Sequence, residues 1–221
     1  MKKTLIIAAL AALTLTAYAQ EPVKDWAKTN RYQEANKAIT QKPKAVFMGD
    51  SITEGWARED PDFFSANNFV GRGIGGQTTA QMLVRFRQDV VALQPKYVLI
   101  MAGTNDVALN NGPISDEAIL ENLKAMCQLA KVNGIKPILC SLLACDRFSW
   151  RKEVGNPADH IAKLNEDIKA YAKEAHIRYI DYHTAMKGEG NNPKAGYTKD
   201  GCHPTLDFYK IMEGIALSNV K

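Results

Sequence analysis

Apolar residues follow two alternating patterns along this chain. From Lys44 onward, short runs of aliphatic and β-branched residues alternate with longer stretches in which apolar residues recur every three or four positions. The short runs predict strands covered on both faces, and the longer stretches predict amphipathic helices. Strands that alternate with helices indicate βα units around a parallel sheet, and therefore an α/β fold. We expect the strands at residues 45–48, 68–70, 97–101, 137–142 and 178–180.

The predicted helices have recognisable start and stop signals. Ser115 is a cap residue followed by the acids Asp116 and Glu117, and it opens a helix over residues 115–132 that stops before Gly134. No internal repeat, low-complexity segment or linker interrupts the pattern, which predicts one domain over residues 20–221. Further helices are expected over residues 25–39, 78–93 and 206–218, and from Asn156-Pro157 onward.

The first 19 residues have a pattern of their own. Lys2 and Lys3 precede an apolar run over residues 5–15, which is followed by the small-x-small site Ala17-Tyr18-Ala19. This pattern predicts a signal peptide over residues 1–19, cleaved after Ala19, and an exported protein that is periplasmic or secreted. A retained membrane anchor is the alternative, but the apolar run is shorter than the roughly 20 residues of a spanning helix. We therefore expect no stable membrane insertion after cleavage.

Composition and charge fit an ordinary globular protein. Of the 221 residues, 46% are hydrophobic and 24% are charged, which argues against a disordered chain, a collagen-like repeat and a coiled coil. The formal net charge of +4 falls to about +2 when Lys2 and Lys3 leave with the signal peptide. A nearly neutral chain without a basic tract gives no electrostatic reason to expect a nucleic-acid partner.

The four cysteines are too few for a scaffold built on disulfides. Cys127 falls on the apolar face of a predicted helix, which favours a packed thiol. Cys140, Cys145 and Cys202 fall near strand ends or in loops, and one disulfide among them is compatible with an exported protein. The sequence does not choose between the pairings. No Cys or His spacing resembles a zinc site, so we expect no structural metal.

Four polar clusters follow strands or precede the last helix. Ligands of parallel α/β sheets bind beyond the carboxyl ends of the strands, so these clusters are candidates for one common site. By itself each has an ordinary interpretation as a helix cap or a turn. Each also carries chemistry: a hydroxyl on a tight turn, N–H groups that glycine brings close to a ligand, an amide donor, and a carboxylate that can hold an imidazole. The clusters are Gly49-Asp50-Ser51-Ile52-Thr53, Gly71-Arg72-Gly73-Ile74-Gly75-Gly76, Gly103-Thr104-Asn105-Asp106 and Asp200-Gly201-Cys202-His203-Pro204.

Together the four clusters resemble the sequence blocks of the SGNH or GDSL hydrolase superfamily, through GDSIT, GIGGQTT, GTND and DGCHP. The resemblance extends over residues 45–205. The residues of its first two motifs are most similar to the branch of the superfamily that contains platelet-activating-factor acetylhydrolases. The resemblance implies a three-layer α/β/α sandwich with a five-stranded parallel sheet of flavodoxin-like order. It also implies a carboxylic ester hydrolase that uses neither a metal nor an organic cofactor.

The resemblance assigns a role to each block. Ser51 is expected to be the nucleophile, His203 the general base and later acid, and Asp200 the residue that orients His203. The oxyanion hole would consist of the N–H of Ser51, the N–H of Gly76 and the side-chain amide of Asn105. Alignment favours Gly76 over Gly75 for the second donor, but a shift of one residue stays open. The chemistry agrees, because a serine hydroxyl needs a nearby base and a tetrahedral oxyanion needs fixed donors.

These roles predict ester hydrolysis through an acyl-enzyme, with a small-molecule or glycan ester as substrate. We expect short acyl groups, such as acetyl on carbohydrate, to be removed. A lysophospholipase or acylhydrolase acting on lipid esters is the alternative. A hypothesis from another class is a non-catalytic carbohydrate-binding protein, which would lack at least one of Ser51, Asn105 and His203. All three are present.

Weaker candidates lie around these residues. Asp50, Arg72 and Trp150 are predicted as substrate contacts, although packing is their ordinary role. His160 and His176 are expected on the surface. His183 follows Asp181 at a strand end, and the two could be interpreted as a second Asp–His dyad. No nucleophile lies near His183 in the predicted arrangement, so we interpret Asp181 as a hydrogen-bonding residue at the strand end.

Overall fold

The computed structural model describes residues 25–221, so the predicted signal peptide lies outside the described residues. Five parallel strands form one sheet in the order β2-β1-β3-β4-β5, which confirms the predicted α/β fold and the flavodoxin-like strand order. The central strands β1 and β3 are buried at every position, as expected for strands covered on both faces. The strands are β1 (Ala45–Gly49), β2 (Phe69–Gly73), β3 (Tyr97–Met101), β4 (Lys136–Cys140) and β5 (Arg178–Ile180).

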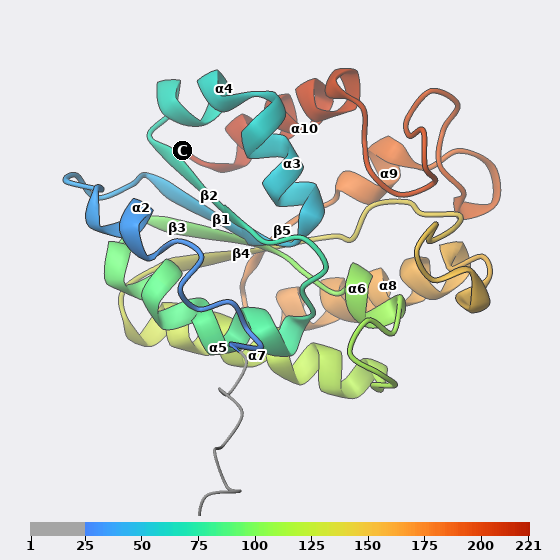
Figure 1. Cartoon of the computed structure of the whole chain (residues 1–221), viewed down its shortest axis with the longest axis horizontal. Coiled ribbons are helices and arrows are strands. Elements are labelled where there is room, and N and C mark those ends of the chain that lie inside the picture. Colours follow the sequence, from blue (N-terminus) through green and yellow to red (C-terminus); the bar gives the residue numbers. More distant parts are fainter. Residues whose placement is uncertain (1–24) are drawn as a thin grey trace, which may run out of the picture.

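Helices cover both faces of the sheet (Figure 1). One layer contains α3 (Ser51–Glu59), α4 (Pro61–Ala66) and α10 (Leu206–Asn219), and the other contains α5 (Thr79–Asp89), α7 (Asp116–Val132) and α8 (Ala158–Glu174). This is the predicted three-layer α/β/α sandwich. None of the helices in residues 25–221 is both long and apolar enough to cross a bilayer. The short helices are α2 (Gln33–Lys37), α6 (Thr104–Val107) and α9 (Tyr182–Met186), with 3₁₀ turns at Val91–Leu93, Lys152–Val154 and Glu189–Asn191.

The predicted helix over residues 25–39 is wrong over most of its length. Only Gln33–Lys37 is α-helical, and turns occupy most of the chain before it. The Asp25 carboxylate accepts hydrogen bonds from Asn30 N–H (3.2 Å) and from the Thr29 hydroxyl (3.1 Å). These local side-chain hydrogen bonds offer the backbone an alternative to the helix.

Two strands end more than one residue away from their predicted ends. Strand β2 continues to Gly73, although its glycines resemble the start of a loop. A Cβ atom at Gly73 would lie 2.1 Å from the backbone nitrogen of Glu54, so glycine lets β2 pass close beneath α3. Strand β4 ends at Cys140, two residues before the predicted end.

Helices α3 and α4 follow from cap residues that the hydrophobic pattern did not reveal. Asp50 caps α3 by accepting a hydrogen bond from Ile52 N–H (3.0 Å). Asp60 caps α4 by accepting one from Phe63 N–H (3.3 Å), and Pro61 fits the first turn. The first of these caps fixes the direction in which the chain leaves β1.

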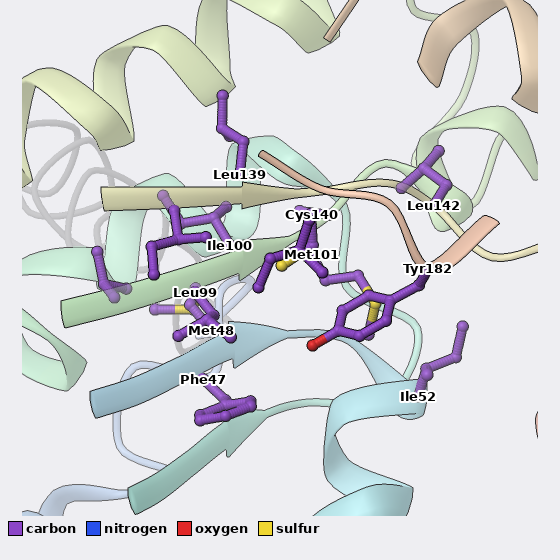
Figure 2. Packing of buried hydrophobic residues seen from close by; sticks show 14 of the residues in the cluster. Phe47, Met48, Ile52, Leu99, Ile100, Met101, Leu139, Cys140, Leu142 and Tyr182 are labelled. Carbon is purple, nitrogen blue, oxygen red and sulfur yellow. The ribbon is translucent and has the colours of Figure 1, made fainter. Parts of the chain in front are cut away.

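The core lies on both sides of the sheet. Figure 2 shows Phe47 and Leu139 on opposite sides of the strands. On the α3 side, Phe47 contacts Trp56 edge-on (5.4 Å between ring centroids), and Trp56 stacks on Phe63 (5.4 Å) and Tyr209 (5.8 Å). This aromatic packing holds α3, α4 and α10 against β1 and so fixes the helix that begins at Ser51.

Candidate active site

Ser51 is the first residue of α3 and follows directly after β1 through Asp50. The N–H of a first helical residue has no partner within the helix, so it remains available to a ligand. Ser51 lies at the edge of a cavity of about 440 Å³, which Arg58, Leu206 and Tyr209 also line. The strand-to-helix turn therefore presents both a hydroxyl and a backbone donor at the carboxyl edge of the sheet.

His203 joins Ser51 from the loop before α10. The Ser51 Oγ lies 2.8 Å from His203 Nε2, and His203 Nδ1 lies 2.6 Å from Asp200 Oδ2. Ser51 and His203 belong to the first and the last of the predicted blocks and are 152 positions apart in the sequence, but they lie within hydrogen-bonding distance here. The structure thus brings the predicted Ser51, His203 and Asp200 together as a hydrogen-bonded triad.

Asp200 is held by its own loop. Its Oδ1 accepts hydrogen bonds from the N–H groups of Cys202 (2.9 Å) and His203 (2.8 Å) and from the Thr198 hydroxyl (2.9 Å). Burial alone would raise the pKa of Asp200, but the N–H groups of His203 and Cys202 and the His203 ring favour the charged form and lower the pKa to about 2. The carboxylate next to the imidazole is therefore ionised at neutral pH.

The glycine block, residues 71–76, passes beside Ser51. The N–H of Gly75 donates to Glu54 Oε2 (2.8 Å), whereas no hydrogen bond engages the N–H of Gly76 in residues 25–221. Gly76 has a φ of +78°, a left-handed conformation that side chains other than hydrogen disfavour. Of the two glycines considered from the sequence, Gly76 is the one whose N–H stays free.

Asn105 lies in α6, just after β3, and its side chain is almost fully buried. Its Nδ2 donates to Asp50 Oδ2 (3.2 Å) and to the Gln77 carbonyl (3.1 Å). The amide thus bridges the turn that carries Ser51 and the loop that carries Gly76. Burial raises the pKa of Asp50 to about 6, because the carboxyl group is removed from water.

The three weaker candidates have different positions. Asp50 is 2% exposed, and its carboxylate accepts hydrogen bonds from Ile52 N–H and Asn105 Nδ2, so it holds neighbouring residues of the site and is not open to substrate. Trp150 is 39% exposed, and its ring centroid lies 5.7 Å from that of His203. These positions leave Trp150 as the candidate with a surface free for substrate.

Arg72 is occupied by contacts elsewhere in the fold. Its guanidinium donates to Asn36 Oδ1 (2.8 Å) and to the Gly71 carbonyl (2.8 Å), and it lies 4.7 Å from the Tyr32 ring centroid. Only 5% of the residue is exposed, and it does not line the cavity at Ser51. The contacts therefore give the predicted substrate role of Arg72 no support.

Arg85 supports the site but gave no signal in the sequence. Its side chain is fully buried and donates to the Gly49 carbonyl (3.0 Å), to Gln77 Oε1 (2.5 Å) and to Asp89 Oδ2 (3.0 Å). Arg85 therefore joins the end of β1 to the glycine loop. In the sequence it forms an ordinary i,i+4 pair with Asp89 on a helix, which usually indicates an exposed face.

All four cysteines are free thiols and buried. Cys145 lies beside Cys202, and burial raises its pKa well above the ordinary value, with the Cys202 thiol adding to the effect. Residues 25–221 contain no group of three or more His, Cys, Asp or Glu side chains arranged to hold a metal ion. His160 and His176 are exposed, as predicted.

A three-layer α/β/α fold with a Ser–His–Asp triad at the carboxyl edge of its sheet is typical of ester hydrolases. Residues 47–211 match the model of the GDSL-like Lipase/Acylhydrolase family. The chain belongs to this family of carboxylic ester hydrolases, which confirms the family inferred from the four blocks.

Solved structures of two relatives agree over nearly the whole described chain. A GDSL-like lipase from Bacteroides thetaiotaomicron is 45% identical, with a TM-score of 0.85, and the match covers 88% of this chain and 97% of that one. A proposed acylhydrolase from Bacteroides fragilis is 43% identical, with a TM-score of 0.86, over 89% of this chain and 97% of that one.

A curated relative matches a shorter segment. The uncharacterised lipoprotein YqeF of Bacillus subtilis is 36% identical over an alignment of 115 residues, and the match covers 44% of this chain and 47% of that protein. The matching segment therefore spans about half the length of that relative.

Proposed function

We propose that this protein hydrolyses esters through a covalent acyl-enzyme on Ser51. The observation that carries the proposal is the series of contacts from Ser51 Oγ to His203 Nε2 (2.8 Å) and from His203 Nδ1 to Asp200 Oδ2 (2.6 Å). The ionised Asp200 keeps a proton on Nδ1, which leaves Nε2 with a lone pair that faces the hydroxyl. This is the arrangement that a general base requires.

The reaction proceeds in two halves. Ser51 Oγ attacks the ester carbonyl carbon while its proton passes to His203 Nε2, and the C–O bond to the alcohol breaks as that proton moves to the leaving oxygen. A water molecule then attacks the acyl-Ser51 ester, gives one proton to His203, and releases the carboxylic acid as Ser51 regains its hydrogen. Asp200 stabilises the imidazolium that forms in each half.

The oxyanion that forms in both halves needs donors at a fixed place. We assign these donors as the N–H of Ser51, the N–H of Gly76 and Nδ2 of Asn105. Gly76 is preferred over Gly75 because the N–H of Gly75 already donates to Glu54. Asn105 Nδ2, which donates to Asp50 and to the Gln77 carbonyl in this structure, would exchange one of these hydrogen bonds for one to the oxyanion. All three donors come from segments that follow parallel strands, so the sheet sets their relative positions.

We propose a short acyl group, such as acetyl on a carbohydrate, as the preferred substrate. The exposed Trp150 ring beside His203 supports this choice, since aromatic faces stack on sugar rings. The cavity at Ser51 carries Arg58 and Lys199 together with Glu59 and Asp200, so it has no excess of one charge for an anionic head group. Leu206, 45% exposed at the same cavity, keeps an acylhydrolase acting on lipid esters as the second candidate.

We also propose that the protein is exported. The basic start, the apolar run and the small-x-small site support a cleaved signal peptide, and the YqeF relative is named as a lipoprotein.

A chain-length series of nitrophenyl esters tests the substrate assignment. We expect kcat/KM to be largest for the acetyl or butyryl ester and to fall with longer chains, because the preferred acyl group is short. Ser51→Ala protein provides the blank for hydrolysis that does not use the site. A maximum at eight carbons or more would replace the acetyl assignment by the lipid one.

A further inference from the structure

Asn110 lies in the loop after α6 and belongs to none of the sequence blocks. Its Nδ2 donates to Asn105 Oδ1 (2.8 Å) and to the Gly76 carbonyl (3.1 Å). Its Oδ1 accepts a hydrogen bond from Trp150 Nε1 (3.0 Å). Both amide hydrogens and the amide oxygen of one side chain therefore have partners, and two of those partners belong to the proposed oxyanion hole.

The chemistry of the partners allows only one orientation of the Asn110 amide. An indole N–H can only donate a hydrogen bond, and a backbone carbonyl can only accept one. Trp150 therefore requires Oδ1 of Asn110 on its side, and the Gly76 carbonyl requires Nδ2 on the other. A flipped amide would direct its oxygen at the oxygens of Gly76 and Asn105 and its hydrogens at the indole N–H, so it would lose all three hydrogen bonds.

The fixed Asn110 amide then determines how Asn105 is held. Asn110 donates a hydrogen bond to Asn105, so the acceptor Oδ1 of Asn105 must face Asn110. Asn105 Nδ2 then points to the opposite side, where Asp50 and the Gln77 carbonyl accept its hydrogen bonds. The Asn105 amide is thus fixed at both ends. Nδ2, the proposed oxyanion donor, is thereby directed to the turn that carries Ser51, where it donates to Asp50 and to the Gln77 carbonyl in this structure.

The same side chain holds the glycine loop. Two successive carbonyls of this loop accept side-chain hydrogen bonds, that of Gly76 from Asn110 and that of Gln77 from Asn105, both at 3.1 Å. Gly76 is in the left-handed region with a φ of +78°, where glycine has several other conformations available. The two bonds tie Gly76 to Asn105 and so set the spacing between two of the three proposed donors.

We propose that Asn110 is a positioning residue of the oxyanion hole, which locks Asn105 and Gly76 in one arrangement, and that the indole N–H of Trp150 sets its direction. This inference rests on the proposed ester hydrolysis. Donors stabilise an oxyanion only when they are preorganised, and functional groups need placement within about 0.5 Å. Removal of a whole donor typically costs about 100- to 1,000-fold in rate, so a donor that is present but loosened should cost about 10- to 100-fold.

Asn110→Ala and Asn110→Asp test this role, with Asn111→Ala as the matched control. Asn111 is the next residue, and its Nδ2 donates to Thr78 Oγ1 (2.9 Å) and Gln81 Oε1 (2.8 Å) at the start of α5, so its hydrogen bonds go to none of the proposed donors. We expect both Asn110 variants to lose about 10- to 100-fold in kcat on nitrophenyl acetate with little change in KM, and Asn111→Ala to stay within about two-fold. Trp150→Phe, which keeps a ring beside His203 but removes the indole N–H, should lose less than the Asn110 variants.

A thionoester partner substrate separates a positioning role from a general loss of structure. The C=S sulfur accepts hydrogen bonds weakly, so its hydrolysis depends less on the oxyanion hole than that of the matching C=O ester. We therefore expect the ratio of oxoester to thionoester rates to fall in both Asn110 variants and to stay at the wild-type value in Asn111→Ala.

The possible failures are distinguishable. Asn110 variants with the activity and rate ratio of Asn111→Ala, in an active enzyme that Ser51→Ala inactivates, would overturn the positioning role alone. A wild-type protein without esterase activity, or an active Ser51→Ala protein, would overturn the proposed function and this inference with it.

Discussion

Asp200 with His203 and Asp181 with His183 are each an Asp followed closely by a His, and each carboxylate accepts the same local hydrogen bonds but holds a different side chain. In each, Asp Oδ1 accepts a hydrogen bond from the N–H three residues further on, at 2.8 Å for Asp200 and 2.9 Å for Asp181. The side chain of that same residue also forms a hydrogen bond with the other carboxylate oxygen, Oδ2. At Asp200 it is His203, whose ring returns to Oδ2, and at Asp181 it is Thr184, whose hydroxyl does so.

The one-residue difference in spacing decides what each histidine can do. His203 is held by Asp200 on one side of its ring and reaches the Ser51 hydroxyl on the other. His183, two residues after Asp181, is 6% exposed, and its Nε2 has no hydrogen-bond partner within residues 25–221. An Asp and a His close in sequence are therefore not a dyad unless the carboxylate has an oxygen free for the ring.

Neutralising each carboxylate in turn should give the largest contrast. Asp200→Asn should lower kcat by about 100- to 10,000-fold, because the amide no longer holds the Nδ1 proton or stabilises the imidazolium. Asp181→Ala should leave kcat unchanged and lose about 1 kcal/mol of stability, the usual cost of removing a helix cap. Hydrolysis of nitrophenyl acetate and urea unfolding of both variants measure these effects. Equal losses of activity would remove the distinction between the two pairs.

A smaller effect concerns the pH dependence of stability. Burial lowers the pKa of His183, the charge of Lys187 lowers it further, and Asp181 partly opposes them. The folded protein therefore binds fewer protons at this site than the unfolded chain, so its stability falls as the pH drops from neutral through the unfolded histidine pKa of about 6.5. His183→Gln should make the loss of stability between about pH 7.5 and pH 5.5 smaller, while kcat at neutral pH stays at the wild-type value. Urea midpoints at the two pH values test this, and an unchanged slope would show that His183 titrates normally.

The sequence predicted the parts of the fold that depend on local patterns. Buried strands such as Tyr97–Met101 are continuous apolar runs, and α7 carries its own cap and stop signals, so both fell close to their predicted places. The helix expected from residue 25 was wrong because a single side chain, that of Asp25, favours a turn. A helix start was expected at Ser51, but the extent of α3 was not predicted, because the motif around its cap, Asp50, was interpreted for chemistry.

The candidate site shows the same division. Ser51, Asn105 and His203 stand in short motifs at strand ends or before the last helix, which a sequence displays directly. Asn110 and Arg85 depend on contacts between distant segments, such as Asn110 with Trp150 and Arg85 with the Gly49 carbonyl. The choice between Gly75 and Gly76 likewise depends on which N–H Glu54 reaches in three dimensions. No spacing rule in one sequence contains this information.

The central claim is that Ser51, activated by His203, is the nucleophile. Its most direct test is labelling of the whole protein with a fluorophosphonate, followed by mass-spectrometric location of the modified residue. The account predicts a single phosphonylated site at Ser51, with labelling lost in Ser51→Ala and strongly slowed in Asp200→Asn. Labelling at any other residue, or undiminished labelling of Ser51→Ala, would contradict it.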